Sequence, residues 1–205
     1  KLNVIDKYPL APIPFLICVI GRVKSGKSVL LSSLSLSPRM YGDDFQVKIF
    51  ISSTAKNDPV NSHIVENFDY VFEEYSTELM KEIVDMIEKD DSGARFLLVL
   101  DDIIGDLEQK KTGKVDYLSS LATKYRHVGN GEQEGKLSII ITTQYFKFLT
   151  PIMRNNCSAY YLMGRFSKNE LNKMAEGLSF FGGDEKEFLK LFERSKQKPY
   201  DFLFL

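Results

Sequence analysis

Residues 21–28 read Gly-Arg-Val-Lys-Ser-Gly-Lys-Ser and lie between two apolar segments, residues 15–20 and residues 29–34. The first segment has the composition of a buried strand and the second that of a helix. The two glycines let the loop curl around a phosphate, and a helix beginning there directs free N–H groups at the anion. The motif predicts a nucleoside triphosphate site formed by Gly21, Arg22, Val23, Lys24, Ser25, Gly26, Lys27, Ser28 and Val29.

Two side chains of this motif suit the charged end of a nucleotide. Lys27 is predicted to reach the β- and γ-phosphates, and the Ser28 hydroxyl is placed to ligate Mg²⁺. A Gly- and Ser-rich turn would match the same pattern by chance. The strand before the motif and the helix after it favour the phosphate loop.

A hydrophobic strand that ends in two carboxylates follows at residues 96–102, FLLVLDD. This is the form of a Walker B element, in which Asp101 would hold the water shell of Mg²⁺ together with Ser28. Asp102 would orient and deprotonate the attacking water. The alternative is that Asp102 caps the next segment or is only solvated. The adjacent acid favours catalysis, although aspartate is one methylene shorter than glutamate.

Two later side chains are candidates for the same chemistry. Gln144 ends the strand pattern of residues 137–144, and there it would contact the γ-phosphate or the attacking water. Ordinary capping of the strand end by Thr142 or Gln144 is the alternative. Arg154 offers a permanent forked charge for a phosphoryl oxyanion, so it is the first candidate for an arginine finger from a neighbouring subunit. A surface salt bridge fits the local spacing of Arg154 equally well.

The rest of the pattern predicts an α/β fold with a mainly parallel sheet. Strands are expected at residues 15–20, 46–51, 68–72, 95–100, 137–141, 158–163 and 200–205, and helices at 29–34, 77–89, 168–178 and 184–192. A strand, a helix and a strand of these lengths form a βαβ unit, which makes neighbouring strands parallel. The 205 residues fit a single domain, with a core at about 15–163 and C-terminal helices and a closing strand at 164–205.

Charge and cysteine content narrow the class of protein. The 27 basic and 28 acidic side chains nearly cancel, so any contact with DNA must come from a local patch. Cys18 and Cys157 fall in different segments, so we expect two small core residues in a reducing compartment rather than a disulfide framework. No apolar run approaches the length of a membrane span, which predicts a soluble intracellular protein without integral membrane insertion.

The motifs taken together are similar to those of a known family. In chain order they are GRVKSGKS (21–28), LLVLDD (97–102), KYRH (124–127), IIITTQ (139–144) and PIMRNN (151–156). This set resembles the DNA-packaging ATPases of nucleocytoplasmic large DNA viruses, virophages and related double-jelly-roll viruses, within the FtsK–HerA superfamily of P-loop translocases. The resemblance covers residues 15 to about 163. The first motif is generic, and the later ones carry the specificity.

The resemblance implies a fold, an assembly and a set of partners. The fold would be a three-layer P-loop NTPase with an additional-strand core, RecA- or FtsK–HerA-like, in which the strand of Gln144 lies between the two Walker strands. The assembly would be a homo-oligomeric ring that hydrolyses ATP with Mg²⁺ and pumps double-stranded DNA into a preformed capsid. A capsid or portal-vertex protein would be its partner, in the host cytoplasm at the virus factory or in the virion.

The resemblance also assigns roles to individual residues. Lys27 and Ser28 match the phosphate and Mg²⁺ ligands, Asp101 the Walker B aspartate, Asp102 the catalytic acid, Gln144 the sensor and Arg154 the arginine finger. It places Arg126 and His127 close to the active-site edge, without a role. The Asp102 position is more often Glu across the superfamily, which makes the identity of the base the weakest of these assignments.

Two other classes of function remain open from the sequence. A small-molecule or nucleoside kinase shares the P-loop, but its lid needs several arginines and the segment after Asp184 has only Arg194. A nucleotide-dependent assembly switch that hydrolyses slowly is the other class. For a DNA motor, Lys110, Lys111 and Lys114 are the best candidates for contact with the DNA backbone. A solvated turn is the alternative for these lysines.

Overall fold

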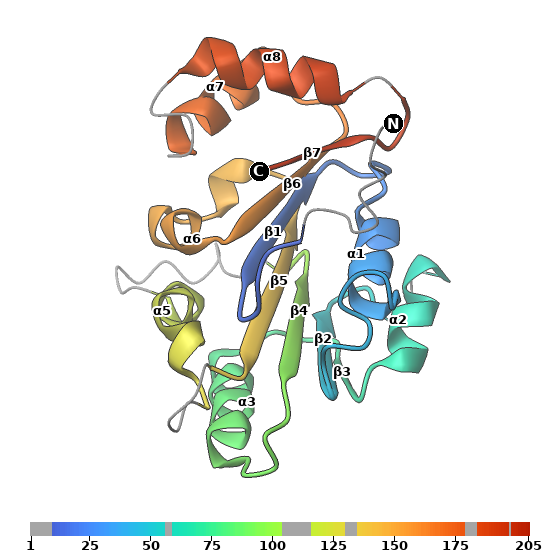
Figure 1. Cartoon of the computed structure of the whole chain (residues 1–205), viewed down its shortest axis with the longest axis vertical. Coiled ribbons are helices and arrows are strands. Elements are labelled where there is room, and N and C mark those ends of the chain that lie inside the picture. Colours follow the sequence, from blue (N-terminus) through green and yellow to red (C-terminus); the bar gives the residue numbers. More distant parts are fainter. Residues whose placement is uncertain (1–9, 56–58, 104–115, 130–134, 179–183, 197) are drawn as a thin grey trace, which may run out of the picture.

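The computed structural model describes residues 10–55, 59–103, 116–129, 135–178, 184–196 and 198–205. Its centre is a sheet with the strand order β3-β2-β4-β5-β1-β6-β7 (Figure 1). Neighbouring strands are parallel except for the closing pair β6–β7, which is antiparallel. The strands are β1 (Leu16–Gly21), β2 (Val47–Ser52), β3 (Tyr70–Phe72), β4 (Phe96–Asp101), β5 (Leu137–Thr143), β6 (Ala159–Met163) and β7 (Phe202–Phe204).

Strand β5 lies between the Walker B strand β4 and the P-loop strand β1. In this register Asp101 of β4 is opposite Thr142 of β5, and Ile20 of β1 is opposite Thr143. The additional-strand order that the resemblance implied is thereby confirmed. Because all three strands are parallel, their carboxyl ends meet at one edge of the sheet, where the functional motifs begin.

Helices cover both faces of the sheet, so the expected three-layer α/β fold is confirmed. Along β1, Leu16, Cys18 and Ile20 face one apolar core, whereas Ile17 and Val19 face the other. Figure 1 shows α1 and α2 on one side of the sheet and α3, α5 and α6 on the other. The helices are α1 (Lys27–Leu36), α2 (Ser62–Asn67), α3 (Thr77–Lys89), α5 (Tyr117–Lys124), α6 (Pro151–Asn156), α7 (Lys168–Gly177) and α8 (Glu185–Ser195).

Helix α3 has the bounds that its periodicity predicted. The Ser76 side chain accepts a hydrogen bond from the Leu79 backbone N–H at 3.0 Å and so caps the helix, while Met80, Ile83 and Ile87 are buried. The short helices α2, α5 and α6 were not predicted from the sequence. The sequence does carry a signal for the start of α6, because Thr150 is a typical helix cap and Pro151 a typical residue of a first helical turn.

The two cysteines are buried and free, as expected of small core residues. The two cysteines are far apart in the sequence, so their proximity was not predicted. The pairing of β1 with β6 brings Cys18 Sγ to 3.0 Å from Cys157 Sγ. Burial raises the pKa of the Cys18 thiol well above its ordinary value, and the hydrogen bond with Cys157 adds to the rise. The Cys18 thiol is therefore held in its protonated form.

Exposed apolar side chains are concentrated around the phosphate loop. In the described part of the chain the large ones are Val23, Val29, Tyr70, Met86, Tyr145 and Tyr200. Val23 belongs to the loop, Val29 to the first turn of α1, and Tyr145 follows the end of β5. Tyr70 belongs to β3 and Met86 to α3, so these two exposed side chains lie in other elements.

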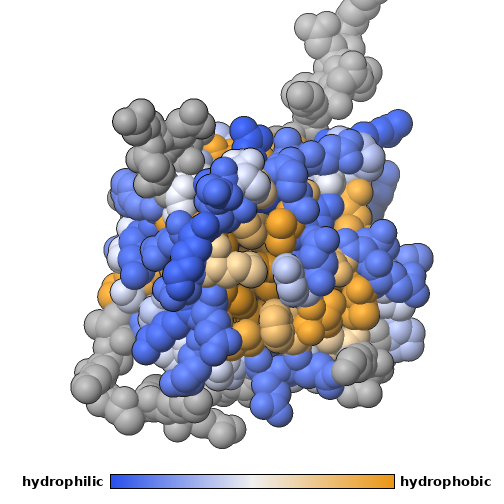
Figure 2. All heavy atoms as spheres, turned by 90° about the horizontal axis from the view of Figure 1, so that it is seen from below, coloured by the Kyte–Doolittle hydropathy of each residue, from blue (hydrophilic) through white to orange (hydrophobic). Residues whose placement is uncertain are grey.

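Apolar and hydrophilic side chains are separated on the face of the molecule that is seen from below (Figure 2). Figure 2 shows apolar side chains in the middle of this face, with hydrophilic side chains around them.

Over the described ranges, none of the helices combines the length and the apolar character needed to cross a membrane.

Candidate active site

The P-loop has the backbone conformation that a phosphate cradle requires. Lys24 and Gly26 have φ angles of 62° and 93°, and the Ser25 N–H donates to the Arg22 carbonyl at 3.1 Å. Left-handed residues that alternate with others in a loop turn successive backbone N–H groups toward one concave surface. At Gly21 a Cβ would lie 2.5 Å from Ser25 Oγ and 3.0 Å from the Met163 carbonyl oxygen, so the first glycine of the motif is required by packing.

The Lys27 side chain folds back along this loop. Its Nζ donates to the Gly21 carbonyl at 2.6 Å and to the Arg22 carbonyl at 3.3 Å. Burial lowers the pKa of Lys27, and the negative charges of Asp102 and then Asp101 oppose that shift. The ammonium group and the two Walker B carboxylates therefore interact electrostatically within one site.

Asp101 is buried at the end of β4, with only 6% of its surface exposed. Thr142 Oγ1 donates to its Oδ1 at 2.6 Å, and Ser52 Oγ donates to its Oδ2 at 3.1 Å. Burial raises the pKa of Asp101; the two hydrogen bonds oppose the rise, and the charge of Asp102 adds to it. Two neighbouring strands thus fix the orientation of this carboxylate.

Asp102 follows immediately and has a left-handed backbone, with φ 53°. Its N–H donates to Thr142 Oγ1 at 3.1 Å, and its Oδ2 accepts a hydrogen bond from Gln144 Nε2 at 2.5 Å. A positive φ at a residue other than glycine is uncommon and is concentrated at functional sites. The structure thus brings Gln144 to the candidate base itself.

Two hydroxyl groups at this edge of the sheet were not predicted to contact the Walker B carboxylate. Ser52 is absent from the motifs quoted above, and Thr142 was expected only as a possible cap of its strand end. Both lie at the carboxyl ends of strands next to β4, and both donate to Asp101. The available signal was a hydroxyl residue immediately after each apolar strand core, at the edge where the P-loop was expected.

The residues at this edge suit Mg²⁺ bound together with phosphate. The Ser28 hydroxyl and the Asp101 carboxylate supply the hard oxygen ligands that Mg²⁺ prefers. Both Asp101 oxygens already accept a hydroxyl hydrogen bond, which fits a contact through coordinated water. Within the described ranges no group of three or more His, Cys, Asp or Glu side chains forms a metal site of its own.

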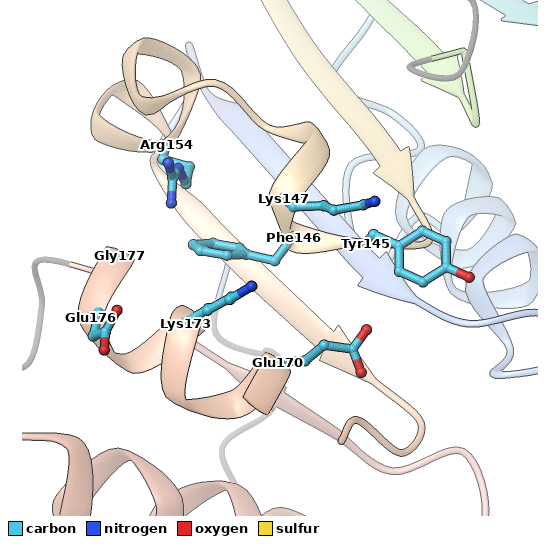
Figure 3. Close-up of a pocket in the computed structure, with 8 residues that line it drawn as sticks. All are labelled: Tyr145, Phe146, Lys147, Arg154, Glu170, Lys173, Glu176 and Gly177. Carbon is cyan, nitrogen blue, oxygen red and sulfur yellow. The ribbon is translucent and has the colours of Figure 1, made fainter. Parts of the chain in front are cut away.

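Arg154 is packed against its own chain. Its Cζ lies 4.8 Å from the centroid of the Phe146 ring, and its Nη1 is 2.7 Å from the position of a Cβ on Gly177. Figure 3 shows Arg154 near Phe146 at one end of a cavity of about 480 Å³ that continues to Glu170. Glu170 is paired with Arg22 of the P-loop at 2.6 Å. The finger role concerns a neighbouring subunit and stays a prediction.

The expectation that Arg126 and His127 lie close to the active-site edge is wrong within one chain. They belong to the 3-10 turn η2 (Tyr125–His127), which precedes β5. The Tyr125 hydroxyl lies 3.0 Å from Ser158 Oγ, and that oxygen accepts from the N–H of Leu16 at the start of β1. Parallel strands start at the same edge, so η2 is at the opposite edge from the P-loop.

The candidate DNA loop, with Lys110, Lys111 and Lys114, lies outside the described residues.

A second cavity adjoins the P-loop on the side of β6. It has a volume of about 410 Å³, and Lys24 and Ser25 of the loop line it together with Gly164, Lys198 and Tyr200. The ring atom Tyr200 Cδ1 lies 3.0 Å from the position of a Cβ on Gly26. Nothing in the sequence motifs pointed to the segment after α8 as part of the site.

Comparisons with known proteins show the family of this chain. The chain matches the family model described as Poxvirus A32 protein over residues 4–203. Comparison with curated protein sequences gives no significant match.

Three solved structures illustrate the likeness of fold. The genome packaging NTPase B204 from Sulfolobus turreted icosahedral virus 2, in complex with AMP, has a TM-score of 0.65 at 16% identity, covering 93% of this chain and 91% of that one. Its complex with ATP-gammaS has a TM-score of 0.62 at 18% identity, with the same coverage. The pCW3 conjugation coupling protein TcpA, a monomer form with ATPgS, has a TM-score of 0.56 at 18% identity, covering 88% and 55%.

The family match takes in every motif of the candidate site, from the P-loop through both carboxylates to Arg154. The similar solved structures share the fold over most of this chain. The chain therefore belongs to the Poxvirus A32 protein family, and it shares its fold with the genome packaging NTPase B204.

Proposed function

We propose that this chain is an ATP-hydrolysing motor that moves double-stranded DNA into a preformed viral capsid. The observation that carries the proposal is the set of side chains at the sheet edge: Asp101 is held by two hydroxyls, and Asp102 accepts a hydrogen bond from Gln144 beside the P-loop. Family membership supports the viral setting. One similar protein, B204, is named as a genome packaging NTPase, and its structures are in complex with AMP, AMPPCP and ATP-gammaS.

In this proposal the residues of the chain divide the chemistry between them. The backbone N–H groups of the P-loop and the Lys27 ammonium bind the phosphates, and Ser28 and Asp101 hold Mg²⁺. Bound Mg²⁺ would neutralise charge that develops on the phosphate oxygens. Asp102 accepts the proton of the attacking water, and the Gln144 amide keeps that carboxylate oriented toward it.

The motor would work as a homo-oligomeric ring, with Arg154 of one subunit stabilising the transition state in the next. Double-stranded DNA and a capsid or portal-vertex protein would be its partners, in the host cytoplasm or the virion. We favour this motor over a nucleoside kinase because β5 lies between the Walker strands, as expected for the additional-strand translocases.

Stimulation of ATP hydrolysis by long double-stranded DNA tests the proposal. We expect phosphate release to rise several-fold when the DNA is added, and Lys27→Ala to hydrolyse no ATP with or without it. Hydrolysis that DNA does not affect would favour the slow assembly switch. Transfer of the γ-phosphate to an added nucleoside monophosphate, rather than to water, would favour the kinase.

A further inference from the structure

A nucleotide bound to this P-loop has a defined direction. Asp101 ends β4, Asp102 follows it and Gln144 follows β5, and both strands lie on one side of β1. The γ-phosphate must point to that side, where the base and the Mg²⁺ ligands are. The nucleoside end must therefore leave the loop on the other side of β1, over β6 and β7.

The cavity of about 410 Å³ lies on that other side. Its lining combines the loop residues Lys24 and Ser25 with Gly164, which follows β6, and with the segment between α8 and β7. The volume is in the range of small-molecule sites. Ser25 is also more than nine-tenths buried, and its Oγ has no hydrogen-bond partner among the described residues. Ser25 thus contributes to the wall of the cavity while its own hydroxyl is buried and unpaired.

Tyr200 gives this cavity an aromatic wall. Its side chain is 70% exposed, its backbone is left-handed with φ 69°, and its ring lies against Gly26. A bulky residue at positive φ is an outlier that the surrounding structure must hold in place. The ring contacts Gly26 on one side and leaves most of its surface exposed, which makes that surface available to a ligand.

The segment that carries Tyr200 is firmly attached to the sheet. Lys196 Nζ donates to the Leu162 carbonyl of β6 at 2.8 Å and to the Asp201 carbonyl at 2.5 Å. The Lys198 N–H donates to Asp201 Oδ2 at 2.7 Å and closes the turn around Tyr200. Lys24 and Arg165 contribute positive charge to the same lining. A flat ring beside cations suits an aromatic base that is attached to phosphate.

We infer that Tyr200 is the nucleobase-binding residue of this chain and stacks on the base of the triphosphate held by the P-loop. The inference rests on the proposed function, because it requires a nucleotide at the P-loop. Stacking uses the face of the base and not its hydrogen-bonding edge, so adenine and guanine nucleotides are expected to depend on Tyr200 alike.

Calorimetric titration with two ligands tests this assignment. One ligand is AMPPCP with Mg²⁺, and the other is inorganic tripolyphosphate with Mg²⁺, which has no base. We expect Tyr200→Ala to weaken AMPPCP about tenfold, as loss of a base–aromatic stack does, and to leave tripolyphosphate affinity unchanged. Tyr200→Phe keeps the ring and is expected to stay within about twofold of the unaltered chain.

The controls separate this inference from the function on which it rests. Tyr70→Ala removes another exposed tyrosine, from β3 at the far edge of the sheet, and is expected to alter neither affinity. Unchanged AMPPCP affinity in Tyr200→Ala, or an equal loss for both ligands, would overturn the assignment. If the unaltered chain binds neither ligand, the nucleotide-dependent function itself fails.

Discussion

At the scale of the single residue, the two carboxylates at the end of β4 have different hydrogen-bond partners. Asp101 is buried and receives two hydroxyl hydrogen bonds, whereas Asp102 is half-buried and receives the Gln144 amide. Thr142 contacts both, since its Oγ1 donates to Asp101 and accepts from the Asp102 N–H. The two neighbours along the chain therefore face different environments, which suits one to the metal and the other to water.

Replacing the candidate base should separate binding from turnover. In Asp102→Asn the side chain keeps its size and its hydrogen-bonding capacity but accepts no proton. We expect ATP to bind as before and the rate of hydrolysis to fall by about 10²-fold or more, measured as phosphate release at saturating ATP. Normal turnover in this variant would move the base to another residue.

Replacing Asp101 should stabilise the protein while it removes activity. A raised carboxyl pKa means that the folded state disfavours the charge, so stability falls as the pH rises through that pKa. Asp101→Asn removes this charge. Without nucleotide or Mg²⁺ at pH 7, we expect the melting temperature to rise by about 2–4 °C, the equivalent of about 1 kcal/mol at this chain size. A lower melting temperature would show that the hydroxyl hydrogen bonds outweigh the cost of the charge.

At the scale of the element, an ion pair joins the end of α3 to the start of β5. Lys136 Nζ donates to the Asp90 carbonyl at 2.6 Å and to Asp90 Oδ2 at 2.8 Å. Both side chains are mostly buried. Asp90 is also the C-terminal cap of α3, so one lysine satisfies a helix end and fixes the helix to the strand that carries Gln144.

The stability that this pair provides should depend on pH. The hydrogen bond from Lys136, with others from Ser92, lowers the pKa of Asp90 to about 2. A lowered carboxyl pKa gives stability that is present above the unfolded value and is lost as the pH falls toward the folded one. Asp90→Asn should therefore lower the melting temperature at pH 7, and the difference should shrink between pH 5 and pH 3. Asp91→Asn, an exposed neighbour, is the control and should melt like the unaltered chain; a pH-independent difference would contradict the prediction.

At the scale of the whole molecule, activity should require contact between subunits. An Arg154→Ala chain lacks the finger and a Lys27→Ala chain lacks the phosphate ligand, so each alone is expected to be inactive. Equimolar mixing creates interfaces where an intact P-loop meets an intact Arg154, and ATP hydrolysis should partly recover there. If both variants assemble and the mixture is no more active than either alone, Arg154 does not act across an interface.

Contact with DNA should depend on the lysine loop after Walker B. A ring would repeat Lys110, Lys111 and Lys114 around the DNA backbone, so their contact would be independent of base sequence and sensitive to salt. Replacing all three with Ala should weaken DNA binding and DNA-stimulated hydrolysis, leave basal hydrolysis nearly unchanged and flatten the salt dependence. Unaltered DNA affinity with an unaltered salt slope would place the contact surface elsewhere.

Sequence by itself determined the parts of this protein that depend on neighbours along the chain. Periodicity predicted α3 at its observed bounds, and apolar runs predicted β1, β4 and β5 to within a residue or two. The P-loop and the two Walker B carboxylates were recognisable because their chemistry needs fixed residue types at short spacing.

Only the tertiary structure decided which distant segments meet. Ser52 and Asp101 are 49 positions apart, and only the pairing of β2 with β4 shows that they share a hydrogen bond. Strand pairing likewise places Arg126 at the edge of the sheet away from the P-loop. The packing of the turn before β7 places Tyr200 against Gly26. The central strands are buried on both faces and have similar apolar sequences. No local pattern therefore specifies which strand lies beside which, and the packing of the whole chain has to choose.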